Sequence, residues 1–341
     1  MTGRGVDQIL PYPCDPKIYE PFVKDARDYV RFAEEINGKI DYPVSFDYIW
    51  GDALKEIEKE KVDLRIINLE TTITTSENFE PKGINYRMNP KNIDVLKVFK
   101  VNVACLANNH ILDFGQEGLL ETIDILNKNG ILIVGAGKNI EEAEKPAIIW
   151  GRATSPILIF SYADVSSGVP IWWKAKKDKA GINLLTEDVP KLIAKYFDVG
   201  RPNIVIFSVH WGPNWGYEIT KEQRNFAHRL IDEANVDLIF GHSSHHFKGI
   251  ETYKGKFIIY GAGDFINDYE GIEGYEEFRG DLVLGYIWEI DKLTILPFKI
   301  KKFRLNYCTQ EKIDWIFNVL KRESKVEGRF ILEEKRIIIK L

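Results

Sequence analysis

The stretch GHSSHHFKGIETYKGKFIIYGAGDFIND, from Gly241 to Asp268, holds three of the six histidines in the chain. His242, His245 and His246 lie close together, after the apolar run LIF and before the apolar run FIIY. This pattern is typical of side chains at the mouth of a buried strand. Because imidazole is the most common metal ligand in proteins, histidines crowded at a strand end indicate a metal-binding loop.

Helix and strand patterns alternate on both sides of this stretch. Apolar residues recur at helical spacing in 52–62, 91–100, 119–130, 187–197 and 221–234. Short apolar runs separate these segments, and from Asp281 the pattern becomes an antiparallel hairpin followed by a helix and a terminal strand. The alternation predicts an α/β sheet with a more antiparallel C-terminal part. We expect a single domain over 1–341, with 296–341 as a helix and strand extension.

Two loops interrupt the regular pattern. A turn at 151–155 is expected to join the strands PAIIW and PILIFSYAD. Residues 164–183 fit no regular element and carry Trp172 and Trp173. Long irregular loops in compact domains often cover active sites, so we expect a cover here, in which the tryptophans either pack or bind a ligand.

Composition bounds the class of protein. The chain has 341 residues, of which 45% are hydrophobic and 28% charged, as in ordinary soluble globular proteins. No apolar run approaches the roughly 20 residues that span a bilayer, and the first residues lack a signal-peptide pattern, so a cytoplasmic location is expected. Cys14, Cys105 and Cys308 form neither a disulfide framework nor a metal knuckle.

Charge is unevenly distributed along the chain. The formal net charge is −5, but residues 292–341 carry 13 Lys and Arg against 6 Asp and Glu, a net of +7. The rest of the chain therefore carries −12, which argues against nucleic-acid binding. The basic tail either docks an anion or forms a solvated face.

Polar clusters follow five of the expected strands: NLE at 68–70, NNH at 108–110, HWG at 210–212, GHSSHH at 241–246 and GDF at 263–265. Sites in α/β sheets lie beyond the carboxyl ends of the strands, so these clusters are expected to converge in one crevice. A carboxylate, an amide and several imidazoles form a mixed oxygen and nitrogen donor set that suits Zn, Mn, Fe or a similar ion.

The same residues also have structural explanations. Glu70 can cap the loop that follows it, Asn109 can satisfy backbone groups in a turn, and Asp113 can begin the next helix. His110 and His210 can be buried core histidines with satisfied rings. The convergence of several clusters, rather than any single residue, favours the site.

Seven motifs occur in the order INLE (67–70), ANNHILDFG (107–115), GAGKNIEEAEKP (135–146), GIN (181–183), HWG (210–212), GHSSHHFKGIE (241–251) and YGAGDF (260–265). In these motifs the chain resembles the bacterial capsule-synthesis family (CapA-like, poly-γ-glutamate biosynthesis), which is related to the calcineurin-like metallophosphoesterases. The resemblance covers about 60–300. It implies a four-layer α/β/β/α sandwich of the metallophosphoesterase type, with a metal crevice at the strand ends.

The resemblance also implies metal ligands. In the related phosphoesterases, paired ions are held by Asp, Asn and His from successive strand-end loops. By motif, Glu70 takes the place of a bridging carboxylate, Asn109 that of the amide ligand, and His210 that of the ligand in the single-histidine loop. His242 and His245 belong to the last histidine element. Two divalent ions, Mn, Zn, Fe or similar, are therefore the expected cofactors.

The same resemblance assigns catalysis to His110, as the imidazole that assists the leaving oxygen, with Asp113 beside it. Two ions about 3.5–4 Å apart polarise a phosphoryl oxygen and lower the pKa of a bridging water, which attacks in line. His110 supplies a proton or positive charge without being a ligand. The predicted substrate-binding residues are Asn108, Trp211, Ser243 and Asp264.

The chain departs from the family pattern at two places. The family begins with a strand that ends in Gly-Asp, followed by a segment like TGRGVDQIL, which here comes directly after Met1. We therefore expect the fold to lack its first strand, with Asp264 in place of that Asp. An intact mass tests the hypothesis that Met1 is an internal methionine of a longer reading frame. The last histidine element is H-x-x-H instead of H-x-H, which makes His245 the stronger ligand, His242 the second, and Ser243 the residue in the place of an imidazole.

Two functions follow from the resemblance. The first is a metal-dependent hydrolase that cleaves a phosphoester or a related anionic bond with metal-activated water. The alternative is a non-catalytic accessory or binding protein for poly-γ-glutamate or another anionic polymer. The expected partners are an anionic small molecule or polymer and other capsule-synthesis proteins, and not nucleic acid.

Overall fold

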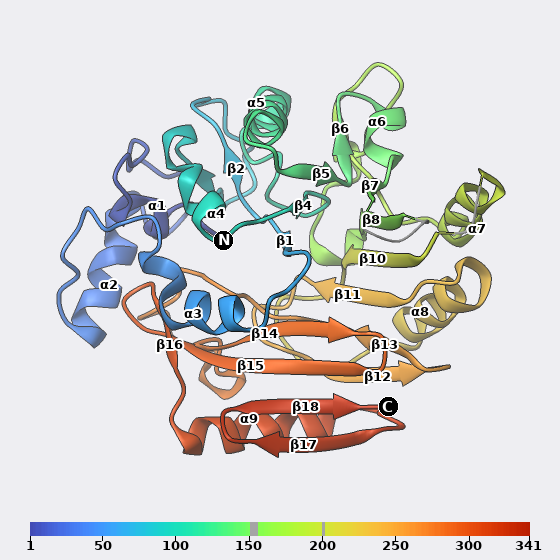
Figure 1. Cartoon of the computed structure of the whole chain (residues 1–341). Helices are drawn as coiled ribbons and strands as arrows, with labels where there is room; N and C mark the ends of the chain where they lie inside the picture. The colour runs from blue at the N-terminus through green and yellow to red at the C-terminus, as the bar shows by residue number, and fades with distance from the viewer. Residues whose placement is uncertain (151–155, 200–201) are drawn as a thin grey trace.

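The largest sheet of the protein has six strands. A computed structural model describes residues 1–150, 156–199 and 202–341 (Figure 1). The strands of this sheet are β7 (Ala147–Ile149), β8 (Ile157–Ala163), β10 (Ile204–His210), β11 (Leu238–His242), β12 (Ile250–Tyr253) and β13 (Lys256–Ile259). Their order is β12-β13-β11-β10-β8-β7; the four inner strands run parallel, and β12 and β7 are antiparallel edges. The predicted turn at 151–155 lies outside the described residues.

Two further sheets accompany it. The parallel sheet contains β1 (Ile66–Asn68), β4 (Val103–Cys105) and β5 (Leu132–Val134). The antiparallel sheet contains β14 (Leu282–Glu289), β15 (Lys292–Ile300), β16 (Leu305–Tyr307), β17 (Arg329–Glu333) and β18 (Arg336–Lys340). Short pairs are formed by β2 (Thr72–Ile73) with β3 (Arg87–Met88), and by β6 (Ala136–Gly137) with β9 (Gly181–Ile182).

Helices cover the sheets. They are α1 (Gly5–Ile9), α2 (Arg27–Asn37), α3 (Gly51–Lys59), α4 (Asp94–Val98), α5 (Gly115–Lys128), α6 (Ile140–Glu144), α7 (Val189–Ala194), α8 (Lys221–Ala234) and α9 (Gln310–Glu323). Helix α8 has the predicted bounds, because the Thr220 hydroxyl and the Gln223 side chain cap it reciprocally and Asn235 ends it in a left-handed conformation.

Strand β10 shows how sequence alternation builds the layers. Val205, Phe207 and Val209 face α7 and α8, where they pack against residues such as Leu230 of α8. Ile206 faces the opposite side and joins the cluster shared with the antiparallel sheet. Successive side chains of a strand point to opposite faces, and each buried large apolar side chain contributes about 1.5–3 kcal/mol. Alternation therefore assigns the even residues of β10 to the side that holds the candidate site.

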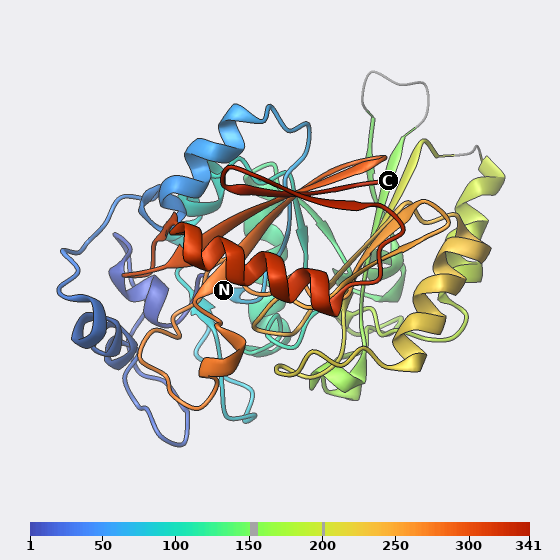
Figure 2. The same cartoon turned by 90° about the horizontal axis from the view of Figure 1, so that it is seen from below.

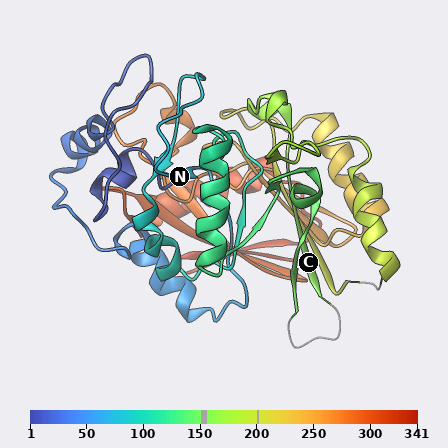
Figure 3. The ribbon, with the colours of Figure 1, turned by 90° about the horizontal axis from the view of Figure 1, so that it is seen from above.

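Three apolar clusters join the layers. One lies between the six-stranded sheet and α7 and α8, and a second joins the other face of that sheet to the antiparallel sheet and α9. The third contains α5, β4 and the end of β15. Figure 2 shows α9 under the antiparallel sheet, and Figure 3 shows α5 over the parallel one. The predicted mixed α/β class is confirmed.

The basic tail meets an acidic helix of the same chain. Arg336 pairs with Glu56 of α3 at 3.4 Å and also with Glu60, and Arg304 lies 3.5 Å from Asp52. Such partly exposed pairs contribute little stability each. Part of the basic tail therefore forms ion pairs with the segment around α3. Neither alternative in the sequence analysis, anion docking or a solvated face, included these pairs.

The N-terminal segment is buried over residues 2–10. Arg4 donates from Nε and Nη2 to Asp268 at 2.8 and 2.6 Å, and from Nη1 to Glu20 at 2.9 Å. Its guanidinium also lies 3.6 Å from the ring centroid of Tyr29. The helix α1 is only five residues long, and its Val6 and Ile9 are buried in an apolar cluster.

The ends of several elements refine the prediction. Residue 296 lies inside β15, so an extension made of whole elements begins at β16. The irregular segment 164–183 contains two short 3-10 turns and the two residues of β9. No helix in the described part of the chain is both long and apolar enough to cross a membrane.

Candidate functional site

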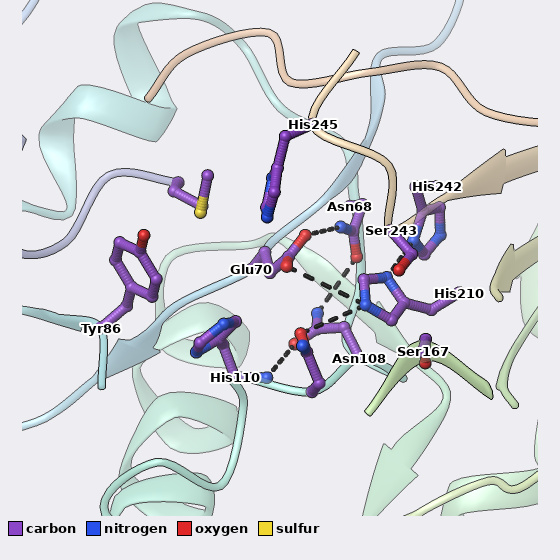
Figure 4. Close-up of polar contacts among 12 residues, drawn as sticks. Asn68, Glu70, Tyr86, Asn108, His110, Ser167, His210, His242, Ser243 and His245 are labelled. Atoms are coloured by element: carbon purple, nitrogen blue, oxygen red, sulfur yellow. Dashed lines mark hydrogen bonds and ion pairs between the residues drawn. The ribbon is translucent and has the colours of Figure 1, made fainter. Parts of the chain in front are cut away.

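The loops after β1 and β4 meet the end of β10, so residues far apart in the sequence become neighbours (Figure 4). The Nε2 atom of His210 lies 3.2 Å from Oδ1 of Asn109 and 3.9 Å from Oε1 of Glu70. A carboxylate, an amide and an imidazole from three of the predicted loops are thus brought together. We call Glu70, Asn109 and His210 the donor set.

Glu70 has one carboxylate oxygen without a partner. The side chain is buried, and Oε2 accepts a hydrogen bond from Nδ2 of Asn68 at 2.9 Å. Oε1 has no hydrogen-bond partner among the described residues, since 3.9 Å to His210 is too long for one. Burial raises the pKa of Glu70 to about 7. Such an oxygen offers an unused ligand for a cation.

Asn108 orients the loops instead of facing a substrate. Its Nδ2 donates to Oδ1 of Asn68 at 3.1 Å and to the carbonyl of Leu69 at 2.9 Å. Its Oδ1 accepts from the backbone N–H of His110 at 3.0 Å. The side chain is fully buried and fully engaged. The predicted substrate contact is therefore replaced by a link between the ends of β1 and β4.

His110 and Asp113 form a buried pair. Nδ1 of His110 lies 2.6 Å from Oδ2 of Asp113, which also accepts from the backbone N–H of Tyr86 at 2.6 Å. Burial lowers the pKa of His110 and raises the pKa of Asp113 to about 7. Nδ1–H of the neutral ring donates to the carboxylate, which leaves Nε2 as the nitrogen available for chemistry. Asp113 thus orients His110, and Gly115 begins helix α5.

Lys82 is a site residue that the sequence did not reveal. Its Nζ lies 2.9 Å from Oδ1 of Asp113 and 3.2 Å from Nδ1 of His110, and it donates to the carbonyl of Asn109. The side chain is 18% exposed, so it is the more accessible member of the His110–Asp113 group. It comes from the loop between β2 and β3, where no motif distinguishes it from other surface lysines.

His242 lies behind His210 and not beside the other donors. The two Nδ1 atoms are 2.7 Å apart, and Nε2 of His242 lies 2.8 Å from Oγ of Ser208. Burial lowers the pKa of His242 to about 3 and also lowers the pKa of His210, so both rings are neutral. With both nitrogens engaged, His242 has none directed at the donor set. The prediction of His242 as a metal ligand does not fit this arrangement.

His245 and Asp264 form an ion pair at the edge of the site. Nδ1 of His245 lies 3.2 and 3.3 Å from the two oxygens of Asp264, and Nε2 lies 3.3 Å from the hydroxyl of Tyr269. Although burial favours the neutral ring, the Asp264 carboxylate raises the pKa of His245. Asp264 is also held by Nδ2 of Asn267 at 2.9 Å. Both predicted residues are present at the site, but they bind each other.

Trp211 and Ser243 do not face the donor set. Trp211 belongs to the apolar cluster under α8, and its indole N–H donates to the carbonyl of Tyr260 at 2.9 Å. The hydroxyl of Ser243 donates to the carbonyl of Gly212 at 2.8 Å. Both residues had been predicted to bind substrate. Neither side chain is positioned to contact one. The φ of Ser243 is +113°, a strained value that marks the loop as tightly constrained.

The donor set fits one divalent ion. In residues 1–150, 156–199 and 202–341, no three His, Cys, Asp or Glu side chains are grouped to hold a metal ion, and the third donor here is an amide. Distances of 3.2 and 3.9 Å between donors suit neighbouring ligands on one ion with bonds of about 2.0–2.2 Å. The oxygen of Glu70 that has no hydrogen-bond partner also favours a bound cation.

Two loops meet each other beside this site. The indole N–H of Trp172 donates to Oε1 of Glu80 at 3.1 Å, and Nζ of Lys82 lies 5.3 Å from the ring centroid of Trp173. Trp173 is buried, whereas Trp172 is largely exposed. The loop that carries the tryptophans therefore meets the loop that carries Lys82, and Trp173 packs as a core residue. Glu70 and His210 of the donor set are buried, whereas Asn109 is partly exposed.

Similarity to known proteins agrees with the motifs. Residues 1–269 match the family described as "Bacterial capsule synthesis protein PGA_cap". The chain is 42% identical over 344 residues to the "Probable polyglutamine synthesis accessory protein" of Mycobacterium tuberculosis, covering 96% of this chain and 90% of that protein. It is 29% identical over 222 residues to the "PGA biosynthesis protein CapA" of Bacillus subtilis, covering 64% and 56%.

The "Capsule biosynthesis protein CapA" of Bacillus anthracis is 28% identical over 193 residues, covering 55% of this chain and 45% of that protein. The chain thus spans about half the length of the two Bacillus proteins and nearly all of the Mycobacterium protein. The family match includes the donor set and the His110–Asp113 pair. The chain therefore belongs to the bacterial capsule synthesis protein family PGA_cap.

Proposed function

We propose that this protein is a metal-dependent hydrolase that cleaves a phosphoester or a related anionic bond. The observation that carries the proposal is the placement of a carboxylate-oriented imidazole, His110, on the residue next to the amide of the donor set. Asp113 lies 2.6 Å from Nδ1 of His110, while the preceding residue, Asn109, lies 3.2 Å from His210. The closeness of His110 to the donor set supports a proton-transfer group beside a cation-binding group.

In this proposal Glu70, Asn109 and His210 hold a divalent ion. When bound, the ion lowers the pKa of a water molecule and polarises an oxygen of the substrate. The expectation of two ions remains a prediction, because His242 and His245 are engaged with other side chains. Elemental analysis of the purified protein decides how many ions it holds, and of which metal.

His110 moves the proton. Because burial keeps the ring neutral and Asp113 binds Nδ1–H, Nε2 carries a lone pair that accepts a proton and passes it to the leaving oxygen. Asp113 holds the ring in this tautomer. Lys82 balances the charge of Asp113 and offers a positive charge to an anionic substrate.

Turnover of an aryl phosphodiester in the presence of Mn or Zn tests the proposal. His110→Gln should lower kcat by about 100-fold or more. His228→Gln is a matched control, because His228 lies on α8, pairs with Glu251 at 2.9 Å and stacks on Tyr253. Equal activity of the two variants, or turnover that does not depend on metal, contradicts the proposal.

A second candidate function is a non-catalytic accessory role in the synthesis of poly-γ-glutamate or another anionic polymer. The observation that favours it is the similarity, over nearly the whole chain, to the Mycobacterium relative named "Probable polyglutamine synthesis accessory protein". Here the crevice binds polymer, and other synthesis proteins are the expected partners. Retained polymer binding by His110→Gln, with no turnover by the wild type, selects this function.

We also infer a four-layer arrangement of the fold and a cytoplasmic location. The four-layer α/β/β/α arrangement is supported by α5 and α9, which flank two of the sheets on opposite sides (Figures 2 and 3). An experimental structure with bound metal tests it. Fractionation of cells from the natural source tests the cytoplasmic location.

A further inference from the structure

A buried tyrosine packs against His110. The ring centroids of Tyr86 and His110 are 4.6 Å apart, and the two ring planes are nearly perpendicular, at 88° (Figure 4). An edge-to-face contact of this kind is a favoured geometry for aromatic rings. Tyr86 is only 1% exposed, and it directly precedes β3. It therefore reaches His110 from a different segment than the loop that carries His110 and Asp113.

The backbone of the same tyrosine holds the partner of His110. The N–H of Tyr86 donates to Oδ2 of Asp113 at 2.6 Å. That oxygen lies 2.6 Å from Nδ1 of His110. Tyr86 thus acts on His110 twice, directly through its ring and indirectly through the carboxylate that accepts the ring N–H.

The ring of Tyr86 is itself fixed in place. Its hydroxyl lies 3.1 Å from the hydroxyl of Tyr269, and the guanidinium of Arg4 lies 4.6 Å from its ring centroid. Arg4 in turn forms buried ion pairs with Glu20 and Asp268. Hydrogen-bond, cation–π and ion-pair contacts therefore anchor the surface against which His110 packs.

We propose that Tyr86 is a positioning residue that sets the tilt of the His110 ring and so the direction of Nε2. Asp113 fixes Nδ1, but a single hydrogen bond leaves the ring free to tilt about it. The ring of Tyr86 removes that freedom. A misplacement of about 1 Å can lower a rate by about 100-fold, so the tilt matters for proton transfer. This inference rests on the proposed function, in which Nε2 of His110 passes a proton.

Two substitutions separate the ring from the other groups of Tyr86. Tyr86→Leu keeps an apolar side chain and the N–H to Asp113 but removes the aromatic ring. It should lower kcat by about 10- to 100-fold with little change in KM. Tyr86→Phe loses only the contact with the hydroxyl of Tyr269, so it should keep most of the wild-type kcat.

Tyr162 provides a matched control. It is 3% exposed and stacks on Phe207 within the apolar cluster under α7 and α8. Tyr162→Leu therefore removes a buried aromatic ring of the same size from a different part of the core. Its kcat should stay close to that of the wild type. A loss of kcat equal to that of Tyr86→Leu would overturn the proposal.

Coupling to His110 separates positioning from a purely structural role. If Tyr86 acts through His110, Tyr86→Leu should cause no further loss of kcat in a protein that already carries His110→Gln. If Tyr86 only supports the fold, the same substitution lowers kcat by the same factor in both backgrounds. Equal factors overturn the proposal.

A spectroscopic measurement does not depend on activity. Cross-relaxation between the ring protons of Tyr86 and His110 should be observed in the wild type, and its absence overturns the proposal even if Tyr86→Leu does not fold. Where Tyr86→Leu folds, the ring signals of His110 should shift. Those of His228, which stacks on Tyr253, should not.

The outcomes distinguish this inference from the proposed function. If the wild type shows metal-dependent turnover and Tyr86→Leu has the same kcat, the positioning role is overturned and the hydrolase stands. If the wild type shows no turnover, yet Tyr86→Leu shifts the ring signals of His110 and not those of His228, the placement of His110 by Tyr86 stands and the hydrolase is overturned.

Discussion

Oδ2 of Asp113 lies 2.6 Å from Nδ1 of His110, three residues earlier in the same buried loop. The carboxylate accepts the ring N–H and is itself held by the backbone N–H of Tyr86. The imidazole therefore has a fixed orientation and a fixed tautomer before any substrate arrives. This relationship separates His110 from the other buried histidines, whose rings serve His242, Asp264 or the backbone.

Asp113→Asn should lower kcat of the proposed hydrolase by about 100-fold or more, with little change in KM. An amide can still accept from His110, but it also carries an N–H where Tyr86 or Lys82 requires an acceptor, so the ring loses its fixed tautomer. Asp124→Asn on the exposed face of α5 is the control. Steady-state kinetics of both variants check the expectation, and equal kcat values contradict it.

Glu70→Gln should change how stability depends on pH. The pKa of Glu70 is raised from 4.5 to about 7 in the folded protein. Between these values the folded state binds the extra proton, so the contribution of Glu70 to the unfolding free energy is lost as pH rises from about 4.5 to 7. The metal-free variant should then be more stable than the wild type at pH 8 by up to about 3 kcal/mol. Denaturant unfolding of the wild type and the variant at pH 4.5 and 8 measures the difference. The same change in unfolding free energy with pH in both proteins would contradict the expectation.

Lys82→Met should raise KM for an anionic substrate and lower kcat/KM by about 10- to 100-fold, because the site loses its accessible cation. Lys82→Arg should recover part of the loss. The effect of salt on KM should be weaker in Lys82→Met than in the wild type. Lys128→Met, an exposed lysine on α5, serves as control. If the KM of Lys82→Met equals that of the wild type, Lys82 has no role in binding the substrate.

Alternation along β10 and β11 explains where several of the predicted site residues lie. Even residues of β10 face the crevice side, so His210 reaches the donor set, whereas Trp211 joins Val205 and Phe207 under α8. Strand alternation alone separates His210 from Trp211, although the sequence analysis placed both residues in one polar cluster. His242 shares the correct face, but its place behind His210 depends on the parallel register of the two strands, which no local pattern encodes.

Residues that are positioned only by tertiary contacts could not be predicted from the sequence. Lys82 enters the site because the loop between β2 and β3 folds against Trp173, and Arg4 is buried because Asp268 and Glu20 neutralise it. By contrast, the bounds of α8 were predictable, since apolar periodicity and capping residues are encoded within the helix itself. Local sequence signals therefore predict the helices and strands, whereas the site depends on how these elements pack together.

Arg4→Met should destabilise the protein by about 3–5 kcal/mol, because it removes the cation that pairs with two buried carboxylates. Arg27→Met removes an exposed pair with Asp25 and should cost less than about 1 kcal/mol. Urea unfolding of both variants measures the contrast. Similar losses for the two would show that the buried pair of Arg4 has no special role in holding the N-terminal segment.

Metal binding should raise the thermal stability of the wild type, and Asn109 should be required for the full effect. A ligand at 100 times its Kd that binds only the folded state stabilises it by about 2.7 kcal/mol. Asn109→Ala removes the amide oxygen that lies 3.2 Å from Nε2 of His210, so at the same Zn or Mn concentration the rise in Tm should be much smaller. Asn127→Ala, on the exposed side of α5, should keep the full rise. Thermal unfolding with and without each metal gives the comparison. If both variants gain as much as the wild type, the ion binds elsewhere and Asn109 is a turn residue.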